Sequence, residues 1–452
     1  MQDLIKSINR DFIDLVEKCD DPKGSLASEF KEMQEKMSKK RCLAGDKVLP
    51  TFIKPIFFTT TQISYFRKIV EILLNCQEKL INLYFESKEH RDLFELTESE
   101  KPLVEINSGL ERWIFFSRLD SIMSGDRLMF LEFNCDSPGG AYYADIQKEC
   151  LLEISVLKEL SRKYKFVIEK YRPRVFDTMM TAWDQFGRQG KPSIAVMGNP
   201  EVTNVEEFRL FAEYFASKGY DSFFTDPWTL EYDGKKLTKD GRKIDLIYRR
   251  GILADYSKHV EETKPVINAY RDGNVCFANP LGAKLGDNKN LLSVLTDEKM
   301  KFLFTSKEME VIKKHIPWTR MVKECKTTYE NKEIDLTTHI RNNKNIFVLK
   351  PNSEYGGKGV VIGIETSQND WENTVDESLV KPMVVQEYVP IPEDEFPVFD
   401  PDLSFKPKKV NTNFLTFAGQ YGGGFARTSD SLVINVSRGG ALATFIVIDD
   451  SI

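Results

Sequence analysis

"FFSRLDSIMSGDRLMFLEFNCDSPGG", residues 115–140, contains two short apolar segments that are joined by a polar turn. Residues 113–116 and 128–133 are rich in aromatic and aliphatic side chains and are predicted to be strands. The turn "MSGDR" between them contains a glycine, which is typical of a hairpin connection. The stretch therefore predicts two adjoining strands whose polar ends can lie side by side.

Those polar ends carry residues suited to a metal and a phosphate. Arg118 and Asp120 are two apart at the end of the first predicted strand, and Glu132 and Asn134 are two apart at the end of the second. Residues two apart on a strand share a face, so all four side chains can point the same way. Carboxylate and amide oxygens suit Mg²⁺, and a guanidinium suits a phosphate. The alternative is an exposed polar face on an edge strand, although the apolar run before Glu132 favours burial.

A second stretch, "VLKPNSEYGGKGVVIG" (residues 348–363), predicts a hairpin, because the apolar runs 346–349 and 360–362 both resemble strands. The hairpin carries glycines and a lysine at its tip and another lysine at its base, namely Gly356, Gly357, Gly359, Lys358 and Lys350. Glycines let backbone N–H groups approach a ligand closely, and lysines add positive charge, so the loop suits a polyphosphate. The alternative is a solvated turn. Neither a Walker A loop nor a dinucleotide-binding fingerprint has this spacing.

Two further segments are candidates for nucleotide contacts. Lys289 opens an apolar helix in "ANPLGAKLGDNKNLLSVL", where it could reach a phosphate or an adenine ring, or simply be a surface lysine. In "MVVQEYVPIP" a buried strand ends at Gln386, Glu387 and Tyr388, where backbone groups could meet an adenine edge. The alternative for this second segment is a plain strand exit.

Composition narrows the function classes. The chain of 452 residues has a formal charge of −6, which argues against nucleic acid or an anionic membrane as the main partner. The N-terminal stretch is broken by charges, which predicts neither a signal peptide nor a membrane span. Seven scattered cysteines and four histidines predict a reducing compartment, the cytoplasm, with neither a zinc site nor a disulfide framework. Chemistry is therefore expected to depend on carboxylates, lysines, arginines and a metal ion.

The rest of the chain predicts a mixed α/β protein. Helical spacing dominates residues 1–95, and residues 143–164 are predicted to form one long helix. Buried strands at 192–197 and 244–251 flank a helix at 204–220, which is typical of a parallel α/β unit. The proline- and acid-rich segment "VPIPEDEFPVFDPDLSFKPK" (389–408) is predicted to be a long loop.

Five motifs and their order along the chain resemble those of the circularly permuted ATP-grasp ligases. They are "SRLD", "LEFNCDS", "DNKNLL", "LKPNSEYGGKGV" and "VVQEYVP". It is similar to the synthetase domain of glutathionylspermidine synthase and, more distantly, to eukaryotic-type glutathione synthetase. In ordinary ATP-grasp proteins the phosphate-binding lysines precede the metal-binding acid and asparagine, and here that order is reversed. The resemblance spans roughly residues 110–440.

The resemblance implies a role for each matched residue. Mg²⁺ would be held by Asp120, Glu132, Asn134 and Glu354. ATP would be contacted along its phosphates by Arg118, Lys289 and Lys350, covered by the lid Gly356, Gly357, Lys358 and Gly359, and held at its adenine by Gln386, Glu387 and Tyr388. Arg427 and Asn435, in "FARTSDSLVINVSRGG", would complete the site. Catalysis would depend on Arg118, Lys350 and Arg427.

The implied function is ATP-dependent formation of an amide bond between a small-molecule or peptide carboxylate and an amine, through an acyl phosphate. The alternatives are a kinase that uses the same site and a nucleotide-binding protein without catalysis. Arg249 or Arg250, in "YRRG", would bind a substrate carboxylate or be structural. The resemblance also allows a homodimer.

The predicted fold is an α/β (α+β) ATP-grasp fold, circularly permuted, and the sequence divides into four regions. Residues 1–95 form a helical N-terminal region, and 96–175 the metal-binding part of the ATP-grasp core. Residues 176–285 form a parallel α/β subdomain on the substrate side, and 286–452 the lid and nucleotide-binding core.

Overall fold

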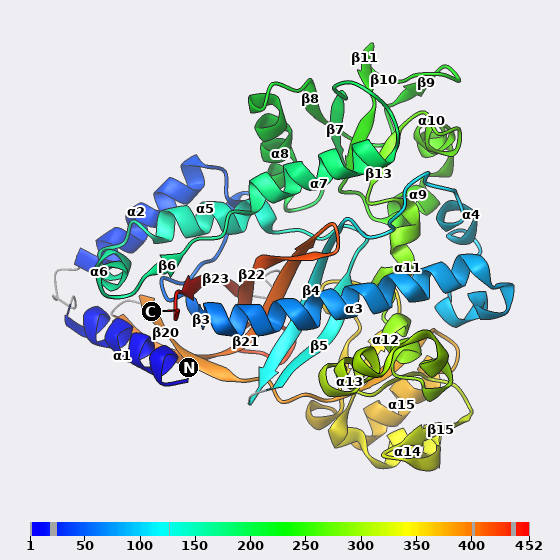
Figure 1. The fold of residues 1–452 in the computed structure, drawn as a ribbon. Helices are drawn as coiled ribbons and strands as arrows, with labels where there is room; N and C mark the ends of the chain where they lie inside the picture. Colours follow the sequence, from blue (N-terminus) through cyan, green and yellow to red (C-terminus); the bar gives the residue numbers. More distant parts are fainter. Residues whose placement is uncertain (1, 19–24, 126, 400–402, 435–439, 452) are drawn as a thin grey trace.

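The computed structural model describes residues 2–18, 25–125, 127–399, 403–434 and 440–451. Three larger β-sheets organise it (Figure 1): a central mixed sheet, a parallel sheet in the part drawn green, and an antiparallel sheet towards the yellow and orange part of the chain. The fold is therefore a mixed α/β arrangement, as the sequence predicts.

The central sheet brings together strands from opposite ends of the chain. Its order is β3 (Ile56–Thr59), β23 (Ala441–Ile448), β22 (Gln420–Ser429), β21 (Leu403–Phe417), β4 (Phe116–Ser124) and β5 (Arg127–Asn134), with β20 (Glu393–Phe399) beside β21 and β6 (Phe166–Val167) beside β23. Neighbours are antiparallel except β3 and β23. The two polar segments of the predicted site, residues 115–140 and 348–363, thus approach each other from separate sheets.

The parallel sheet has the order β13 (Cys276–Ala278), β12 (Leu246–Arg249), β7 (Ile194–Met197) and β8 (Ser222–Thr225). The antiparallel sheet has the order β14 (Thr319–Met321), β19 (Met383–Glu387), β17 (Phe347–Pro351) and β18 (Val361–Ile362). The short strands are β1 (Leu43–Ala44), β2 (Lys47–Val48), β9 (Glu231–Tyr232), β10 (Leu237–Lys239), β11 (Arg242–Ile244), β15 (Lys326–Tyr329) and β16 (Lys332–Asp335). The parallel unit and the glycine-rich hairpin β17–β18 confirm the sequence predictions.

Helices cover these sheets. The α-helices are α1 (Gln2–Lys18), α2 (Ser25–Lys39), α3 (Thr60–Glu86), α4 (Lys101–Val104), α5 (Ala141–Leu151), α6 (Ser155–Lys163), α7 (Tyr171–Gln185), α8 (Val205–Ser217), α9 (Leu253–Lys258), α10 (Val260–Arg271), α11 (Lys284–Asp287), α12 (Asn290–Leu295), α13 (Ser306–His315), α14 (Leu336–Asn342) and α15 (Gln368–Ser378). Short 3₁₀ turns are η1 (Lys88–Phe94), η2 (Leu281–Ala283), η3 (Glu298–Leu303), η4 (Lys344–Ile346) and η5 (Gly363–Glu365). None of the helices in the described ranges is long and apolar enough to span a membrane.

The central sheet separates two apolar cores. Phe414 and Phe445 pack on the side of α3, where Phe66 lies 5.5 Å from Phe414 between ring centroids. Their chain neighbours Leu415 and Ile446 belong to the core that α5 and α7 share. Successive residues of a strand point to opposite faces, so the alternation places one core on each side. Helix α3 itself starts at a capping box formed by Thr59 and Gln62.

Three sequence predictions of secondary structure are wrong. Within the predicted loop 389–408, residues 393–399 form β20 and residues 403–408 begin β21. Strand β20 is an edge strand, where prolines such as Pro397 are tolerated. Residues 143–164 form two helices, α5 and α6, with a turn between them. Strand β4 begins at Phe116, so the "SRLD" motif lies inside the strand and not after it.

The region 1–95 is mainly helical but also supplies β1, β2 and β3, and β3 is part of the central sheet. The predicted division of the chain at residues 95, 175 and 285 stays a prediction.

Candidate functional site

The register between β4 and β5 places the four polar residues of the first motif on one face. Arg118 pairs directly with Asn134, and Asp120 pairs directly with Glu132. Directly paired residues on antiparallel strands share a face, so the side chains lie together as predicted. A bulge follows Asp120, because the next pair is Ser121 with Phe130. All four side chains line one cleft.

Arg427 reaches the same cleft from the far end of the chain. Asp120 pairs with Asn413 on β21, and Asn411, two residues earlier, pairs with Arg427 on β22. The four residues thus share the sheet face that lies opposite to α3. Arg427 Nη2 donates to Asp120 Oδ2 at 2.5 Å and to Asn411 Oδ1 at 3.0 Å.

Asp120 is held between two guanidinium groups. Arg118 donates from Nε to Oδ1 at 2.8 Å and from Nη2 to Oδ2 at 3.2 Å, and Arg427 binds Oδ2. The Asp120 side chain is 6% exposed. Burial alone would raise the pKa of Asp120, but the two arginines outweigh it and hold that pKa below its usual value. Arg427 Nε is buried and has no hydrogen-bond acceptor among the described residues.

Glu132 and Asn134 are less tightly bound within the protein. The Glu132 carboxylate is 27% exposed and lies 3.6 Å from Lys289 Nζ. Asn134 Nδ2 donates to the Arg118 carbonyl at 3.3 Å, which turns the amide oxygen of Asn134 the other way. A carboxylate and an amide oxygen on one wall of a cleft can serve as ligands for a hard divalent cation.

Lys350 enters the cleft from the antiparallel sheet. Its Nζ donates to Gln386 Oε1 at 2.6 Å and to the Leu131 carbonyl at 3.4 Å. Burial lowers the pKa of Lys350 to about 8; the charge of Lys289 adds to this effect, while Glu132 and Asp120 oppose it. The contact with Leu131 joins the hairpin β17–β18 to strand β5.

Part of the cleft lining is apolar. It comprises Ile122, Leu131, Val348, Val360, Ile362, Tyr388, Val389 and Ile391, with Gln386 and Glu387 at its edge. Such a lining suits a planar heteroaromatic ring. The backbone N–H groups of Glu387 and Tyr388 already donate to the Trp318 and Ile346 carbonyls, both at 2.8 Å. A ring bound there would therefore be held by other atoms of this strand exit.

The glycine-rich loop lies across the cleft. Gly356 and Gly357 line it, as do Leu432, Val433 and Ile434 on the opposite side. Gly357 has φ +72°, and a Cβ built on it would lie 2.4 Å from Val433 Cγ1. The loop therefore reaches the opposite wall, and glycine is required at this contact both for its positive φ and for space.

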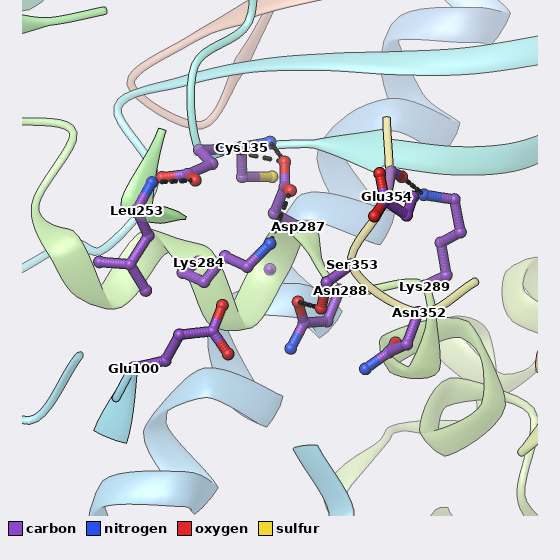
Figure 2. A network of polar contacts seen from close by, with 12 residues as sticks. Glu100, Cys135, Leu253, Lys284, Asp287, Asn288, Lys289, Asn352, Ser353 and Glu354 are labelled. Carbon is purple, nitrogen blue, oxygen red and sulfur yellow. Dashed lines mark hydrogen bonds and ion pairs between the residues drawn. The ribbon is translucent and has the colours of Figure 1, made fainter. Parts of the chain in front are cut away.

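Not every predicted site residue lines the cleft. Lys289, Glu354, Lys358 and Gly359 are absent from its lining. Lys289 Nζ lies 3.6 Å from Glu132 Oε1. The same Nζ donates to the Glu354 carbonyl at 2.6 Å (Figure 2). The side chains of Lys358 and Glu354 are 77% and 45% exposed and lie 3.7 Å from each other. Asn435 falls outside the described residues.

Arg249 and Arg250 are buried and paired with acidic side chains within the protein. Arg249 donates to Asp136 Oδ1 at 2.6 Å and to the carbonyls of Asn279, Gly251 and Pro280. Arg250 donates to Glu207 and to the Tyr248 hydroxyl, both at 3.1 Å. Their side chains are 0% and 1% exposed. The structural alternative of the sequence analysis is thus the one that the geometry supports.

Two polar residues of this region escape sequence reasoning. Asn411 lies in the polar stretch "KPKKVNTN" of β21, where no single polar residue stands out as a cleft residue. Asp287 stands two residues before Lys289 in "DNKN", and its carboxylate binds the backbone just after Asn134 (Figure 2). The adjacent Lys289 was the available signal for Asp287.

A divalent cation in the cleft would need ligands besides protein carboxylates. Within the described part of the chain, no group of three or more histidine, cysteine, aspartate or glutamate side chains is arranged to hold a metal ion. Mg²⁺ is commonly bound by one or two carboxylates together with substrate phosphates. Glu132 and Asn134 fit that pattern, and Asp120 fits it if the two arginines turn to a phosphate.

Comparison with known proteins identifies the fold. Residues 235–386 match the family model described as a circularly permuted ATP-grasp. This chain has the fold of a circularly permuted ATP-grasp protein. A glutathione synthetase-like effector from Globodera pallida, in its apo form, has a TM-score of 0.55 at 11% sequence identity, and the match covers 92% of this chain and 96% of that one. The predicted resemblance to this family is confirmed, whereas the closer likeness to glutathionylspermidine synthase stays a prediction.

Two further solved structures match over most of their own length. A putative gamma-glutamylcysteine synthetase from Methylobacillus flagellatus has a TM-score of 0.43 at 13% identity, covering 83% of this chain and 88% of that one. The ATP-grasp ligase PsnB, complexed with a minimal precursor, has a TM-score of 0.32 at 14% identity, covering 55% of this chain and 90% of that one. No curated protein sequence matches the chain.

Proposed function

We propose that this ATP-grasp protein is an ATP-dependent carboxylate–amine ligase. One observation carries the proposal: Arg118, Asp120, Glu132 and Asn134 from one sheet edge, Lys350 from another sheet and Arg427 from the C-terminal part line a single cleft. Separate polar faces with no common ligand would show no such convergence. A cleft lined by apolar side chains together with cations and carboxylates suits Mg–ATP.

Each group has a proposed task at the phosphate end. Arg118 and Arg427 bind the terminal phosphate, since their guanidinium groups face the cleft and Arg427 retains a buried, unpaired Nε–H. Lys350 binds an inner phosphate, and Asp120, Glu132 and Asn134 hold Mg²⁺. Bound Mg²⁺ would neutralise charge that develops on the transferred phosphoryl group. The loop at Gly356 and Gly357 excludes water from the cleft.

The proposed reaction has two steps. An oxygen of the substrate carboxylate attacks the terminal phosphorus, the bond to ADP breaks, and an acyl phosphate forms. The nitrogen of an amine then attacks the acyl carbon, the bond to the phosphate oxygen breaks, and the amine loses a proton as the amide forms. The substrates are small-molecule or peptide carboxylates and amines. The likeness in fold to a glutathione synthetase-like protein supports this substrate class.

The test is ADP release from Mg–ATP across paired carboxylates and amines, with the products analysed by mass spectrometry. A ligase releases ADP in amounts equal to the amide formed and needs both substrates. A stable phosphorylated product from one substrate alone would replace the proposal with a kinase. Absence of ADP release under every pairing, with nucleotide still bound, would indicate a binding protein.

A variant ties the activity to the cleft. Glu132→Gln should lower ADP release by more than about 100-fold while the fold is retained, because the lost charge belongs to a proposed metal ligand. Glu333→Gln, in the exposed part of β16, is the matched control and should behave as the unaltered chain. Full turnover by Glu132→Gln would contradict the metal assignment.

A further inference from the structure

The segment where α11 ends and α12 begins contacts both the chain that follows β5 and the base of the glycine-rich loop. It comprises Asp287, Asn288, Lys289 and Asn290. Figure 2 shows Asp287 beside Cys135, which follows β5, and shows Asn288 and Lys289 beside the loop at Asn352, Ser353 and Glu354. Of these four residues, only Lys289 has a role that the sequence predicts.

Asp287 binds the backbone immediately after Asn134. Its Oδ1 accepts from the N–H groups of Cys135 at 2.8 Å and Asp136 at 3.0 Å. Lys284 Nζ lies 3.4 Å from Oδ2, and the Lys284 side chain is 6% exposed. Burial would raise the pKa of Asp287, but Lys284 and the two backbone N–H groups outweigh it and hold the pKa below its usual value. The carboxylate is therefore a charged acceptor at a defined place.

These bonds fix the direction in which the chain leaves β5. Two backbone N–H groups held by one oxygen restrain the peptide planes that follow Asn134, and thereby the side chains of Asn134 and Glu132 on the preceding pleat. Metal affinity depends on such restraint, because outer groups orient the ligands that touch the ion. Asp136 adds a second restraint through Arg249 and through the Leu253 N–H, at 2.6 Å and 2.7 Å.

The same segment also fixes the base of the glycine-rich loop. Lys289 N donates to the Asn352 carbonyl at 3.2 Å, and Asn290 N donates to Asn352 Oδ1 at 2.9 Å. Lys289 Nζ bridges the Glu354 carbonyl and the Glu132 carboxylate. One short segment thus sets the distance between the proposed metal ligands and the loop that covers the phosphates.

We propose that Asp287 is a positioning residue, which holds the end of β5 so that Glu132 and Asn134 can bind a divalent cation together with nucleotide phosphates. The inference rests on the proposed function. Asp287 acts through the two backbone N–H groups and does not touch the cation. The role requires an acceptor oxygen within reach of both N–H groups, and the negative charge of Asp287 matters less.

The experiment measures Mn²⁺ binding by electron paramagnetic resonance in the presence of saturating AMP-PNP, so it does not depend on turnover. Asp287→Ala removes the acceptor, Asp287→Asn keeps an acceptor oxygen at the same reach, and Asp287→Glu keeps the charge but displaces it by one methylene. The control is Asp226→Ala, because Asp226 also accepts a backbone N–H just after a strand, from Trp228 at 2.8 Å, but lies outside the cleft lining.

The expected result is a loss of about 10- to 100-fold in Mn²⁺ affinity for Asp287→Ala and Asp287→Glu, with Asp287→Asn and Asp226→Ala close to the unaltered chain. If Asp287→Ala does not fold, the comparison of Asp287→Asn with Asp287→Glu decides. Retained affinity in Asp287→Glu with loss in Asp287→Asn, or unchanged affinity in both, overturns the positioning role. Failure of the unaltered chain to bind AMP-PNP with Mn²⁺ would instead overturn the proposed function, and this inference with it.

Discussion

At the scale of single residues, the cleft contains basic and acidic side chains that are close together. A bound ligand would change both the protonation and the ion pairing of these side chains. Lys350 is buried beside the positive charge of Lys289, which leaves its ammonium with a pKa of about 8. Asp120 is already paired with Arg118 and Arg427. A triphosphate with its cation offers new partners to all of them, so binding should reorganise the ion pairs rather than add to them.

If Lys350 binds a nucleotide phosphate as proposed, nucleotide affinity should depend on pH. Below its pKa of about 8 the ammonium is present in the free protein, and above that value the amine is neutral until a phosphate restores its proton. AMP-PNP affinity should therefore be flat near about pH 7 and fall above about pH 8, by at most about tenfold per pH unit for one proton. Calorimetric titration across this range measures the profile.

Lys350→Arg is the control for this prediction, because a guanidinium stays charged throughout the range. Its affinity should be level where that of the unaltered chain declines. Parallel profiles for the two proteins would show that another group controls the pH dependence.

At the scale of elements, the loop between β17 and β18 has a backbone conformation that requires several glycines. Gly356, Gly357 and Gly359 all have positive φ values, and Gly357 meets Val433 across the cleft. A hairpin that needs three such residues in a short loop is shaped for close approach rather than for turn formation alone.

Gly357→Ala should weaken AMP-PNP binding by about tenfold, because a Cβ strains the positive φ and collides with Val433, and about 1.4 kcal/mol corresponds to that factor. Fluorescence titration with a labelled nucleotide measures the affinity. The added substitution Val433→Ala should recover part of the loss, since it removes the collision but leaves the backbone strain.

Gly241→Ala is matched to this variant, because Gly241 has φ +76° and nothing within 4 Å of its added Cβ. It should cost comparable backbone strain and leave nucleotide affinity unchanged. Equal affinities for Gly357→Ala and the unaltered chain would contradict a role of the loop in covering phosphates.

At the scale of the whole molecule, a buried ion pair and a hydrogen bond join the three larger sheets at the end of β5. Arg249 on β12 of the parallel sheet binds Asp136, which follows β5 of the central sheet. Lys350 joins the antiparallel sheet to β5 through the Leu131 carbonyl. The end of β5 is therefore the place where all three sheets meet.

Arg249→Met should lower the free energy of unfolding by about 3–5 kcal/mol, because it leaves the buried Asp136 carboxylate without its cation. Urea unfolding followed by tryptophan fluorescence measures the change. Arg242→Met removes an exposed pair with Asp221 and should cost no more than about 1 kcal/mol. A similar small cost for Arg249→Met would indicate that Arg249 is free to serve a substrate instead.

Local sequence was sufficient where the determining interaction is local. The pairs Arg118–Asp120 and Glu132–Asn134, the hairpin around Gly356 and Gly357, and the helix that Lys289 opens all follow from strand alternation, turn chemistry and helix periodicity. These patterns repeat over a few residues, so a single sequence reveals them. The reversed motif order also predicted the permuted ATP-grasp fold.

Tertiary structure alone decided which of these residues meet, and in what ionic state. Arg427 binds Asp120 across 307 residues of sequence, and Asp287 binds the backbone at Cys135 across 152. Lys289 lies 3.6 Å from Glu132 and does not line the cleft, and residues 393–399 form a strand because β21 is available as a partner. The physical reason is that partner choice depends on the summed packing and electrostatics of segments far apart in the chain, and no local period carries that information.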